Sequence, residues 1–255
     1  MSSYPIKKHF QESLIRASRQ ANDPQIISSA KEFFARSHVL KYSYNFNWLS
    51  RPIIQYPQDI VAFQEIVSLV SPDLIIETGI AHGGSLVLSA SMLCLLDVME
   101  GIDPRQSNRR VVGVDIDIRS HNREALEEHP LRFKIELIEG SSIDRNIVEQ
   151  VHAYAKNRDR ILVSLDSNHT HDHVLSELEA YACLTSVGSY CIVFDTVIDD
   201  LPTGSFPDRE WDEENNPKTA LQHWHKNHPE FEIDRTIDEK LLISVAPQGY
   251  LKRLR

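Results

Sequence analysis

Short apolar runs alternate with longer amphipathic runs through the middle of the chain. The apolar runs are typical of strands that are buried on both faces, and helical periodicity lies between them. The expected strands cover residues 74–77, 110–115, 135–139, 161–165 and 190–194, and the expected helices cover 58–70, 85–99, 123–129, 144–156 and 171–183. This alternation predicts a mostly parallel sheet that helices cover on both faces.

The alternation stops after residue 195. Residues 198–216 are polar and contain Pro202 and Pro207, and they form too long a stretch for a routine connection. We therefore expect a functional lid or a partly mobile segment there. A helix is predicted to follow, because Pro217 suits the first helical position.

Residues 231–236 and 241–245 are predicted to pair as a terminal antiparallel hairpin. Parallel βα units followed by such a hairpin have the layout of a class I methyltransferase. This is a Rossmann-like α/β fold with a mostly parallel seven-stranded sheet. A nicotinamide-binding Rossmann domain would usually continue with parallel units instead.

The first 55 residues differ from the rest. Residues 1–55 are expected to form a helical, aromatic-rich cap, and residues 56–255 the main domain. Pro24 is a good first residue for one helix. The aromatic run at 42–49 fits either a cap or oligomer contact, or packing into the core, because aromatic side chains bury much area in both settings.

The composition indicates one large globular domain: 255 residues, of which 41% are hydrophobic and 25% charged. The formal net charge of -10 argues against a broad nucleic-acid surface. No apolar run approaches the roughly 20 residues of a membrane span. Residues 1–5 lack the pattern of a signal peptide, so we expect a cytoplasmic protein.

The three cysteines are Cys94, Cys183 and Cys191. An odd number without CxxC spacing fits a reducing compartment, and it argues against a zinc site or a disulfide framework. Cys94 and Cys191 lie in apolar runs and are expected to be buried.

A glycine-rich turn follows the first predicted strand, from Glu77 to Ser85. Gly79 permits a tight turn, and Gly83 and Gly84 let a ligand approach the backbone closely. A ligand is expected at this point of an open α/β sheet. The spacing matches neither the dinucleotide fingerprint nor a P-loop, and a purely structural turn is the alternative.

Asp115 ends the next predicted strand. A carboxylate at this place can accept hydrogen bonds from ribose hydroxyls, in NAD as well as in S-adenosylmethionine. A surface aspartate is the alternative interpretation. The third strand ends in Gly140, Ser141 and Ser142, which we expect beside the edges of an adenine ring.

Asp166 and Asp195 each follow an apolar strand. Adjacent parallel strands would bring both carboxylates to the carboxyl edge of the sheet, where unpaired charges are costly. Oxygen ligands suit Mg2+, which orients a substrate hydroxyl and makes it easier to deprotonate. The alternative is that both aspartates cap helices.

The histidines at 169, 171 and 173 alternate along the chain. They resemble a metal-binding box, but alternation does not bring all three side chains to one point of a helix. A general base at His169 or His171 is the better interpretation, because neutral imidazole can take a proton near pH 7.

Together these segments resemble the cephalosporin hydroxylase family, over roughly residues 40–253. The segments that carry the resemblance are 77–85, 165–175, 187–190, 194–196 and 215–220. The family is similar in fold and cofactor site to metal-assisted O-methyltransferases that use S-adenosylmethionine. Its members are associated with antibiotic tailoring and with modification of cell-surface sugars.

The resemblance implies a role for each matched residue. The implied cofactor residues are Glu77, Gly79, Gly83, Ser85 and Asp115, to which we add His82, Gly84, Ser141 and Ser142. The implied metal ligands are Asp166 and Asp195, with Thr196 completing the second ligand pair, and Asp166 counts as catalytic together with the candidate bases.

The chain departs from its relatives at three positions. Thr196 stands where catechol-type methyltransferases have asparagine. Phe194 stands where the antibiotic-pathway relative has an acid. Asn168 stands where macrolide-sugar methyltransferases have a second aspartate, which favours a histidine as the base.

These observations predict an S-adenosylmethionine-dependent, Mg2+-assisted O-methyltransferase. The expected acceptor is a hydroxyl on a cell-surface sugar or on a natural-product intermediate. We expect a homo-oligomer that binds this acceptor and neither nucleic acid nor a membrane. The alternatives are a metal-dependent hydroxylase with an iron site, and a non-catalytic partner protein that binds the cofactor.

Overall fold

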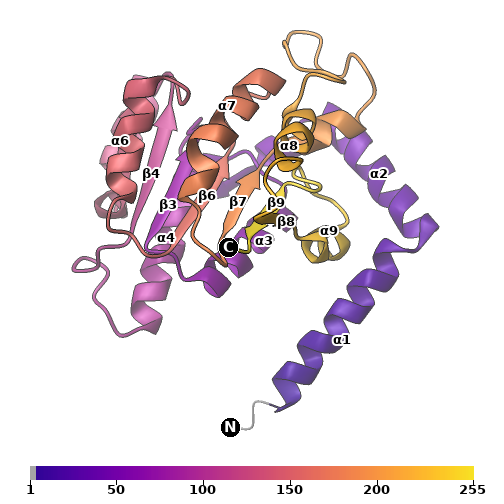
Figure 1. Ribbon diagram of the computed structural model, residues 1–255, viewed down its shortest axis with the longest axis horizontal. Coiled ribbons are helices and arrows are strands. Elements are labelled where there is room, and N and C mark those ends of the chain that lie inside the picture. The colour runs from indigo at the N-terminus through magenta and orange to yellow at the C-terminus, as the bar shows by residue number, and fades with distance from the viewer. Residues whose placement is uncertain (1–3) are drawn as a thin grey trace.

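A seven-stranded sheet forms the centre of the computed structural model, which describes residues 4–255 (Figure 1). The strand order is β5-β4-β3-β6-β7-β9-β8. The first five of these strands run parallel, and β9 is antiparallel to both β7 and β8. The strands are β3 (Leu74–Thr78), β4 (Arg110–Asp115), β5 (Ile135–Glu139), β6 (Ile161–Leu165), β7 (Tyr190–Val193), β8 (Phe231–Ile233) and β9 (Tyr250–Arg253). The predicted α/β fold with a mostly parallel sheet is confirmed.

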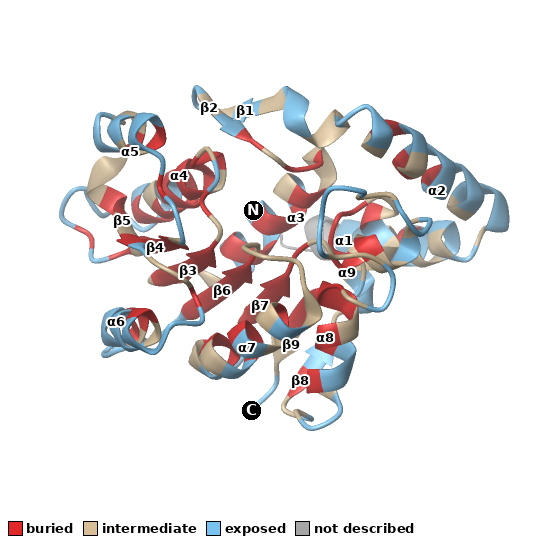
Figure 2. Cartoon of the chain, turned by 90° about the horizontal axis from the view of Figure 1, so that it is seen from above, coloured by how far each residue is buried: buried red, intermediate tan, exposed pale blue. Residues whose placement is uncertain are grey.

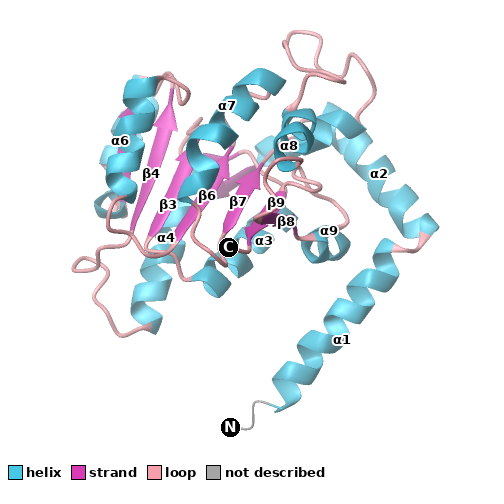
Figure 3. Ribbon diagram, in the orientation of Figure 1, coloured by secondary structure: helices cyan, strands magenta, loops and turns pink. Residues whose placement is uncertain are grey.

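Helices cover both faces of the sheet, as Figures 2 and 3 show. Helices α3 (Pro57–Val70), α4 (Gly84–Met99) and α5 (Ser120–Glu127) lie on one face. Helices α6 (Arg145–Ala155), α7 (His171–Tyr181) and α8 (Pro217–His225) lie on the other. Short 3-10 turns occur at η1 (Tyr42–Asn45), η2 (Arg132–Lys134), η3 (Ala182–Leu184) and η4 (Thr196–Asp200).

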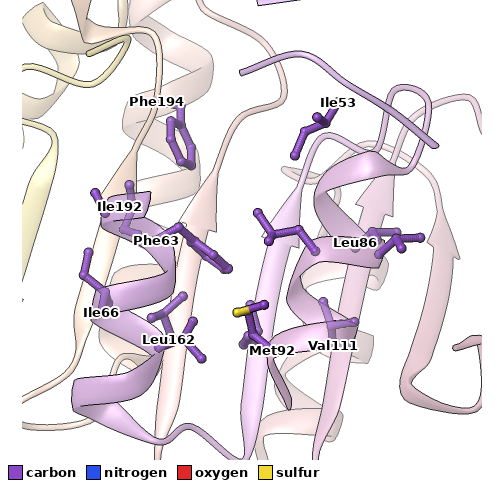
Figure 4. Packing of buried hydrophobic residues seen from close by; sticks show 14 of the residues in the cluster. Ile53, Phe63, Ile66, Leu86, Met92, Val111, Leu162, Ile192 and Phe194 are labelled. Atoms are coloured by element: carbon purple, nitrogen blue, oxygen red, sulfur yellow. The ribbon is translucent and has the colours of Figure 1, made fainter. Parts of the chain in front are cut away.

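Successive strand residues contribute to two hydrophobic layers. Ile75 and Leu162 pack in the layer that contains Phe63 of α3, part of which Figure 4 shows. Ile76 and Val163 pack in the layer of α6, α7 and α8. These strand residues are fully buried. Strands with two buried faces read as continuous apolar runs, which is why the sequence located them.

Two of the predicted helix starts are confirmed by their caps. Asp144 accepts a hydrogen bond from the N–H of Asn146 at the start of α6. Asn216 and Thr219 form a capping box at the start of α8, and Pro217 occupies the first helical position.

The prediction for the C-terminal hairpin is wrong in its second strand. The partner of β8 is β9, and α9 (Arg235–Leu241) lies between them. Asp234 caps that helix by accepting a hydrogen bond from the N–H of Thr236 (3.1 Å). Leu241 and Val245 are apolar because they pack into the first hydrophobic layer, and they are not paired in a strand.

The N-terminal segment contains α1 (Tyr4–Ala21), α2 (Pro24–Val39) and an unpredicted hairpin of β1 (Phe46–Trp48) and β2 (Arg51–Ile53). Tyr42, Phe46 and Trp48 pack against the core, which favours core packing for the aromatic run. The domain boundary at residue 55 stays a prediction. The expectation that residues 1–5 do not form a signal peptide concerns mainly residues 1–3, which lie outside the described residues.

Two further expectations concern single residues and membrane spans. Cys191 is buried as predicted, whereas Cys94 is only partly buried, so that expectation is wrong for Cys94. Its place on α4 is next to Leu95, which is exposed. Among the described helices, none is both long and apolar enough to cross a membrane.

Candidate active site

The glycine turn between β3 and α4 lies against two other parts of the chain. Gly79 and Gly83 have positive φ angles of 86° and 82°, which favour glycine. A Cβ on Gly79 would lie 1.9 Å from the carbonyl oxygen of Asp166, and a Cβ on Gly84 would lie 2.2 Å from that of Pro52. Glycine therefore allows the loop after β6 and the strand β2 to contact the turn.

Asp115 holds this turn from the end of β4. Its carboxylate accepts hydrogen bonds from the backbone N–H groups of Ile80 (2.8 Å) and Ala81 (3.1 Å). Asp115 also lines the larger cavity beside the turn. The residue therefore has a structural role in addition to the ribose contact, which stays a prediction.

Arg51 on β2 holds the same turn, and no sequence motif predicts this role. Its Nε donates to the carbonyl oxygen of His82 (2.9 Å), and its Nη2 donates to Oδ1 of Asn122 (2.8 Å). Asn122 in turn donates to the carbonyl oxygen of Ala81 (2.9 Å). The role of Arg51 cannot be predicted from the sequence, because it depends on how the β1–β2 hairpin packs over α4 and α5.

Two adjoining cavities open at the carboxyl edge of the sheet beside the turn. Their volumes are about 580 Å³ and about 210 Å³, and Tyr44 and His82 line both of them. Phe206 and Trp211 line the larger cavity. Ligand pockets commonly span about 300–1,000 Å³, so this space can hold a nucleoside cofactor and a small acceptor.

Three side chains that can bind a metal meet where the cavities join. Asp166, His169 and Asp195 each offer one ligand atom, and these atoms lie within 4.8 Å of one another. Nε2 of His169 is 3.1 Å from Oδ2 of Asp195. Gln55 donates from Nε2 to Oδ2 of Asp166 (3.4 Å). The two aspartates follow the neighbouring strands β6 and β7, which is why the sequence predicts that they meet.

Negative charge dominates this place. Burial, followed by the charges of Asp195 and Glu77, raises the pKa of Asp166 well above its ordinary value. Burial also raises the pKa of Glu77 to about 7, against hydrogen bonds from Ser85 and Ser89. Oε1 of Glu77 is buried without a partner among the described residues. This donor set of carboxylate oxygens fits a bound cation, which would offset the repulsion.

The residues on either side of Asp195 do not belong to the cluster. Phe194 is packed in the first hydrophobic layer (Figure 4). Thr196 is fully buried, and its hydroxyl donates to the carbonyl oxygen of Pro247 (2.8 Å). The backbone of Asp195 has a φ of 55°, which breaks the strand alternation. The structure does not bring Thr196 to the aspartates, and its role as a ligand stays a prediction.

The alternate histidines lie in three different places. His169 joins the acidic cluster. Nδ1 of His171 lies 2.8 Å from Oγ1 of Thr219 on α8, and His171 lines neither cavity. Nε2 of His173 lies 3.0 Å from Oγ of Ser142. Of the two candidate bases, only His169 lies at the site.

The remaining predicted cofactor residues divide into two groups. His82 and Ser85 line the smaller cavity, beside Gly79 and Gly84. Ser141 and Ser142 are not among the residues that line either cavity. The adenine contact of these two serines stays a prediction.

Two aromatic rings of the segment predicted as a lid, Phe206 and Trp211, line the larger cavity. Trp211 lies edge-on to His169, with ring centroids 4.7 Å apart. Phe206 lies edge-on to His38 of α2, with centroids 4.9 Å apart. The segment predicted as a lid and the N-terminal helices therefore meet over the cavity.

The fold is that of S-adenosylmethionine-dependent O-methyltransferases. Within this class, residues 40–254 match the model of the Rhamnosyl O-methyltransferase/CmcI family, and the chain belongs to that family. The predicted cephalosporin hydroxylase family and enzyme class are confirmed.

Relatives at the sequence level carry the name rhamnosyl O-methyltransferase. The one from Mycobacterium tuberculosis is 30% identical over 202 residues, which are 76% of this chain and 73% of the relative. The one from Mycobacterium leprae is 25% identical over 213 residues, covering 81% of this chain and 82% of the relative.

Solved structures agree in fold. CmcI with Mg and S-adenosylmethionine has a TM-score of 0.54 at 18% identity, covering 83% of this chain and 78% of CmcI. An O-methyltransferase from Bacillus cereus in complex with SAH has a TM-score of 0.50 at 16% identity, covering 80% and 81% of the two chains. At these identities the likeness concerns the fold alone.

Proposed function

We propose that the protein transfers the methyl group of S-adenosylmethionine to a sugar hydroxyl, assisted by a magnesium ion. The observation that carries this proposal is the meeting of Asp166, His169 and Asp195 beside the glycine turn. The rhamnosyl O-methyltransferases among the relatives support a sugar as the acceptor. Such a sugar belongs either to a cell-surface polysaccharide or to a natural product.

The glycine turn and Asp115 would hold the cofactor. S-adenosylmethionine supplies a methyl group on a sulfonium, which reacts by in-line displacement. Asp115 would accept hydrogen bonds from the ribose hydroxyls while it holds the turn. Glu77 lies behind the turn and lines a small internal cavity with Asp166. A cationic cofactor would favour the ionised form of the Glu77 carboxyl group, whose pKa burial raises to about 7.

Asp166 and Asp195 would hold the magnesium ion. A bound Mg2+ makes a substrate hydroxyl more acidic and orients it. His169 would then accept the hydroxyl proton, and Asp195, 3.1 Å from its Nε2, would stabilise the imidazolium. Trp211 covers the imidazole ring on one side and excludes water from it. The chain itself thus contributes alignment, proton transfer and exclusion of solvent.

The geometry argues against an iron-dependent hydroxylase. A mononuclear iron site of that kind needs two histidines and a carboxylate that face one point. Among the histidines of the described residues, only His169 meets the acids, and His171 contacts Thr219 on α8.

The test compares Asp166→Asn with wild type and with Asp208→Asn, an exposed acid in the lid. Calorimetry should show that all three bind S-adenosylmethionine. Methyl transfer to rhamnosyl acceptors should be lost in Asp166→Asn, and in wild type after treatment with EDTA. Activity should return when Mg2+ is added to wild type. Absence of cofactor binding in wild type would overturn the proposal.

A further inference from the structure

One stripe of α7 connects the loop after β5 to the loop after β6. Nε2 of His173 lies 3.0 Å from Oγ of Ser142 and 3.1 Å from Oγ of Ser167. Oγ of Ser167 donates to Oε1 of Glu177 (2.7 Å). One turn further along the helix, the hydroxyl of Tyr181 donates to the carbonyl oxygen of Ser142. We call His173 and Glu177 the α7 bridge.

The available protons set the direction of these hydrogen bonds. The hydroxyl of Ser167 has one proton, and it goes to Glu177. The hydrogen bond between His173 and Ser167 therefore needs a proton on Nε2 of His173. An N–H group placed between the hydroxyls of Ser142 and Ser167 holds both loops to the same helix.

Glu177 is a costly residue at this position. Its side chain is 0% exposed, and its Oε2 has no hydrogen-bond partner in the part of the chain that the structure describes. A buried carboxylate with an unpaired oxygen is less favourable than an apolar side chain of similar size. Packing alone does not explain an acidic side chain at position 177. The hydrogen bond that Glu177 accepts from the hydroxyl of Ser167 does explain it.

Ser167 directly follows Asp166, so the bridge acts on the backbone beside a candidate metal ligand. On its other side, Asp166 is held to β3, because its N–H donates to the carbonyl oxygen of Thr78 (3.0 Å). The loop is thus fixed from both sides. Side chains that orient the ligands of a metal typically contribute a factor of about 10–100 to its affinity.

We infer that His173 and Glu177 are positioning residues, which act through Ser167 to hold Asp166 in the orientation that binds a divalent cation. The inference rests on the proposed function, because it takes the acidic cluster to be the cation site.

The test titrates Mg2+ by calorimetry into the full chain saturated with S-adenosylhomocysteine. His173→Leu should weaken Mg2+ binding by about tenfold or more and leave S-adenosylhomocysteine binding and the melting temperature near wild type. His173→Gln should retain Mg2+ affinity, because its amide N–H can replace the Nε2–H. Glu179→Gln, a change at an exposed acid on the same helix, should also bind Mg2+ normally.

Two results in the variants would overturn the inference. One is unchanged Mg2+ affinity in His173→Leu. The other is an equal loss in His173→Leu and His173→Gln with a lower melting temperature, which would show a packing role. If wild type binds S-adenosylhomocysteine but no Mg2+, the metal part of the proposed function fails first, and the inference fails with it.

Discussion

At the scale of single residues, Asp59 holds one wall of the site. Its carboxylate accepts hydrogen bonds from Oγ of Ser244 (2.6 Å), the hydroxyl of Tyr250 (2.9 Å) and the N–H of Val245 (3.0 Å). Val245 lines both cavities. Asp59 is fully buried, and this burial raises its pKa to about 6, although the hydrogen bonds oppose the shift.

The raised pKa of Asp59 predicts a pH-dependent stability. Its ordinary value is 3.8, so between about pH 4 and 6 the folded state binds more protons than the unfolded state. The free energy of unfolding should therefore contain a contribution that is lost as the pH rises through 6. This contribution is at most about 3 kcal/mol. Asp59→Asn cannot ionise, so urea unfolding should show a flatter pH dependence. Equal slopes in both proteins would contradict this account.

Arg51 is the second residue with a testable effect. Its guanidinium holds the carbonyl oxygen of His82 and the side chain of Asn122. Arg51→Leu removes charged hydrogen bonds, each worth about 1.5–3 kcal/mol. We expect S-adenosylmethionine binding to weaken by roughly tenfold or more in calorimetry. Arg36→Leu, at an exposed arginine of α2, should bind as wild type does. An Arg51→Leu variant that keeps full affinity would show that the turn holds its shape unaided.

At the scale of elements, burial decided which strands the sequence could reveal. The strands β3, β4, β6 and β7 are buried on both faces, the edge strand β5 is partly exposed, and all five were predicted to within about a residue. The hairpin of β1 and β2 has three-residue strands and a proline, Pro52, so it carries little local signal. The strand β9 was not predicted, because the apolar residues before it were predicted to form the strand. Those residues, such as Val245, pack into the core instead.

The same distinction applies to the site. Asp166 and Asp195 were predictable, because strand topology alone brings the ends of β6 and β7 together. Arg51 and Gln55 were not, because their places depend on how the N-terminal hairpin packs over the sheet. The choice between His169 and His171 was also left open by the sequence, and the structure places His169 beside the acids and His171 against Thr219.

The contact between the glycine turn and the loop after β6 gives the third prediction. Gly79→Ala places a methyl group against the carbonyl oxygen of Asp166, so both cofactor and Mg2+ affinity should fall. Gly101→Ala is a matched control, because Gly101 has a similar φ of 75° and nothing within 4 Å. Both variants carry the strain of a positive φ. Calorimetry that finds the same binding in both would show that no clash occurs.

At the scale of the whole molecule, the helix α1 reaches away from the sheet, as Figure 1 shows. The helix contacts α9, and Ala17 is buried. Its earlier part exposes large apolar side chains: Phe10 is 62% exposed, Leu14 51% and Ile15 55%. Grouped apolar exposure of this kind marks interaction surfaces, so the predicted homo-oligomer has a place to form.

We therefore expect the chain to self-associate through α1. Leu14→Glu adds a charge to this surface without touching the sheet or the cavities. It should shift sedimentation velocity toward the monomer while leaving S-adenosylmethionine affinity unchanged. Gln11→Glu adds the same charge at an exposed polar position of the same helix, and it should keep the wild-type association state. The comparison separates loss of apolar contact from added charge. A wild-type chain that stays monomeric at every concentration would contradict the prediction, and the apolar face of α1 would then need another explanation.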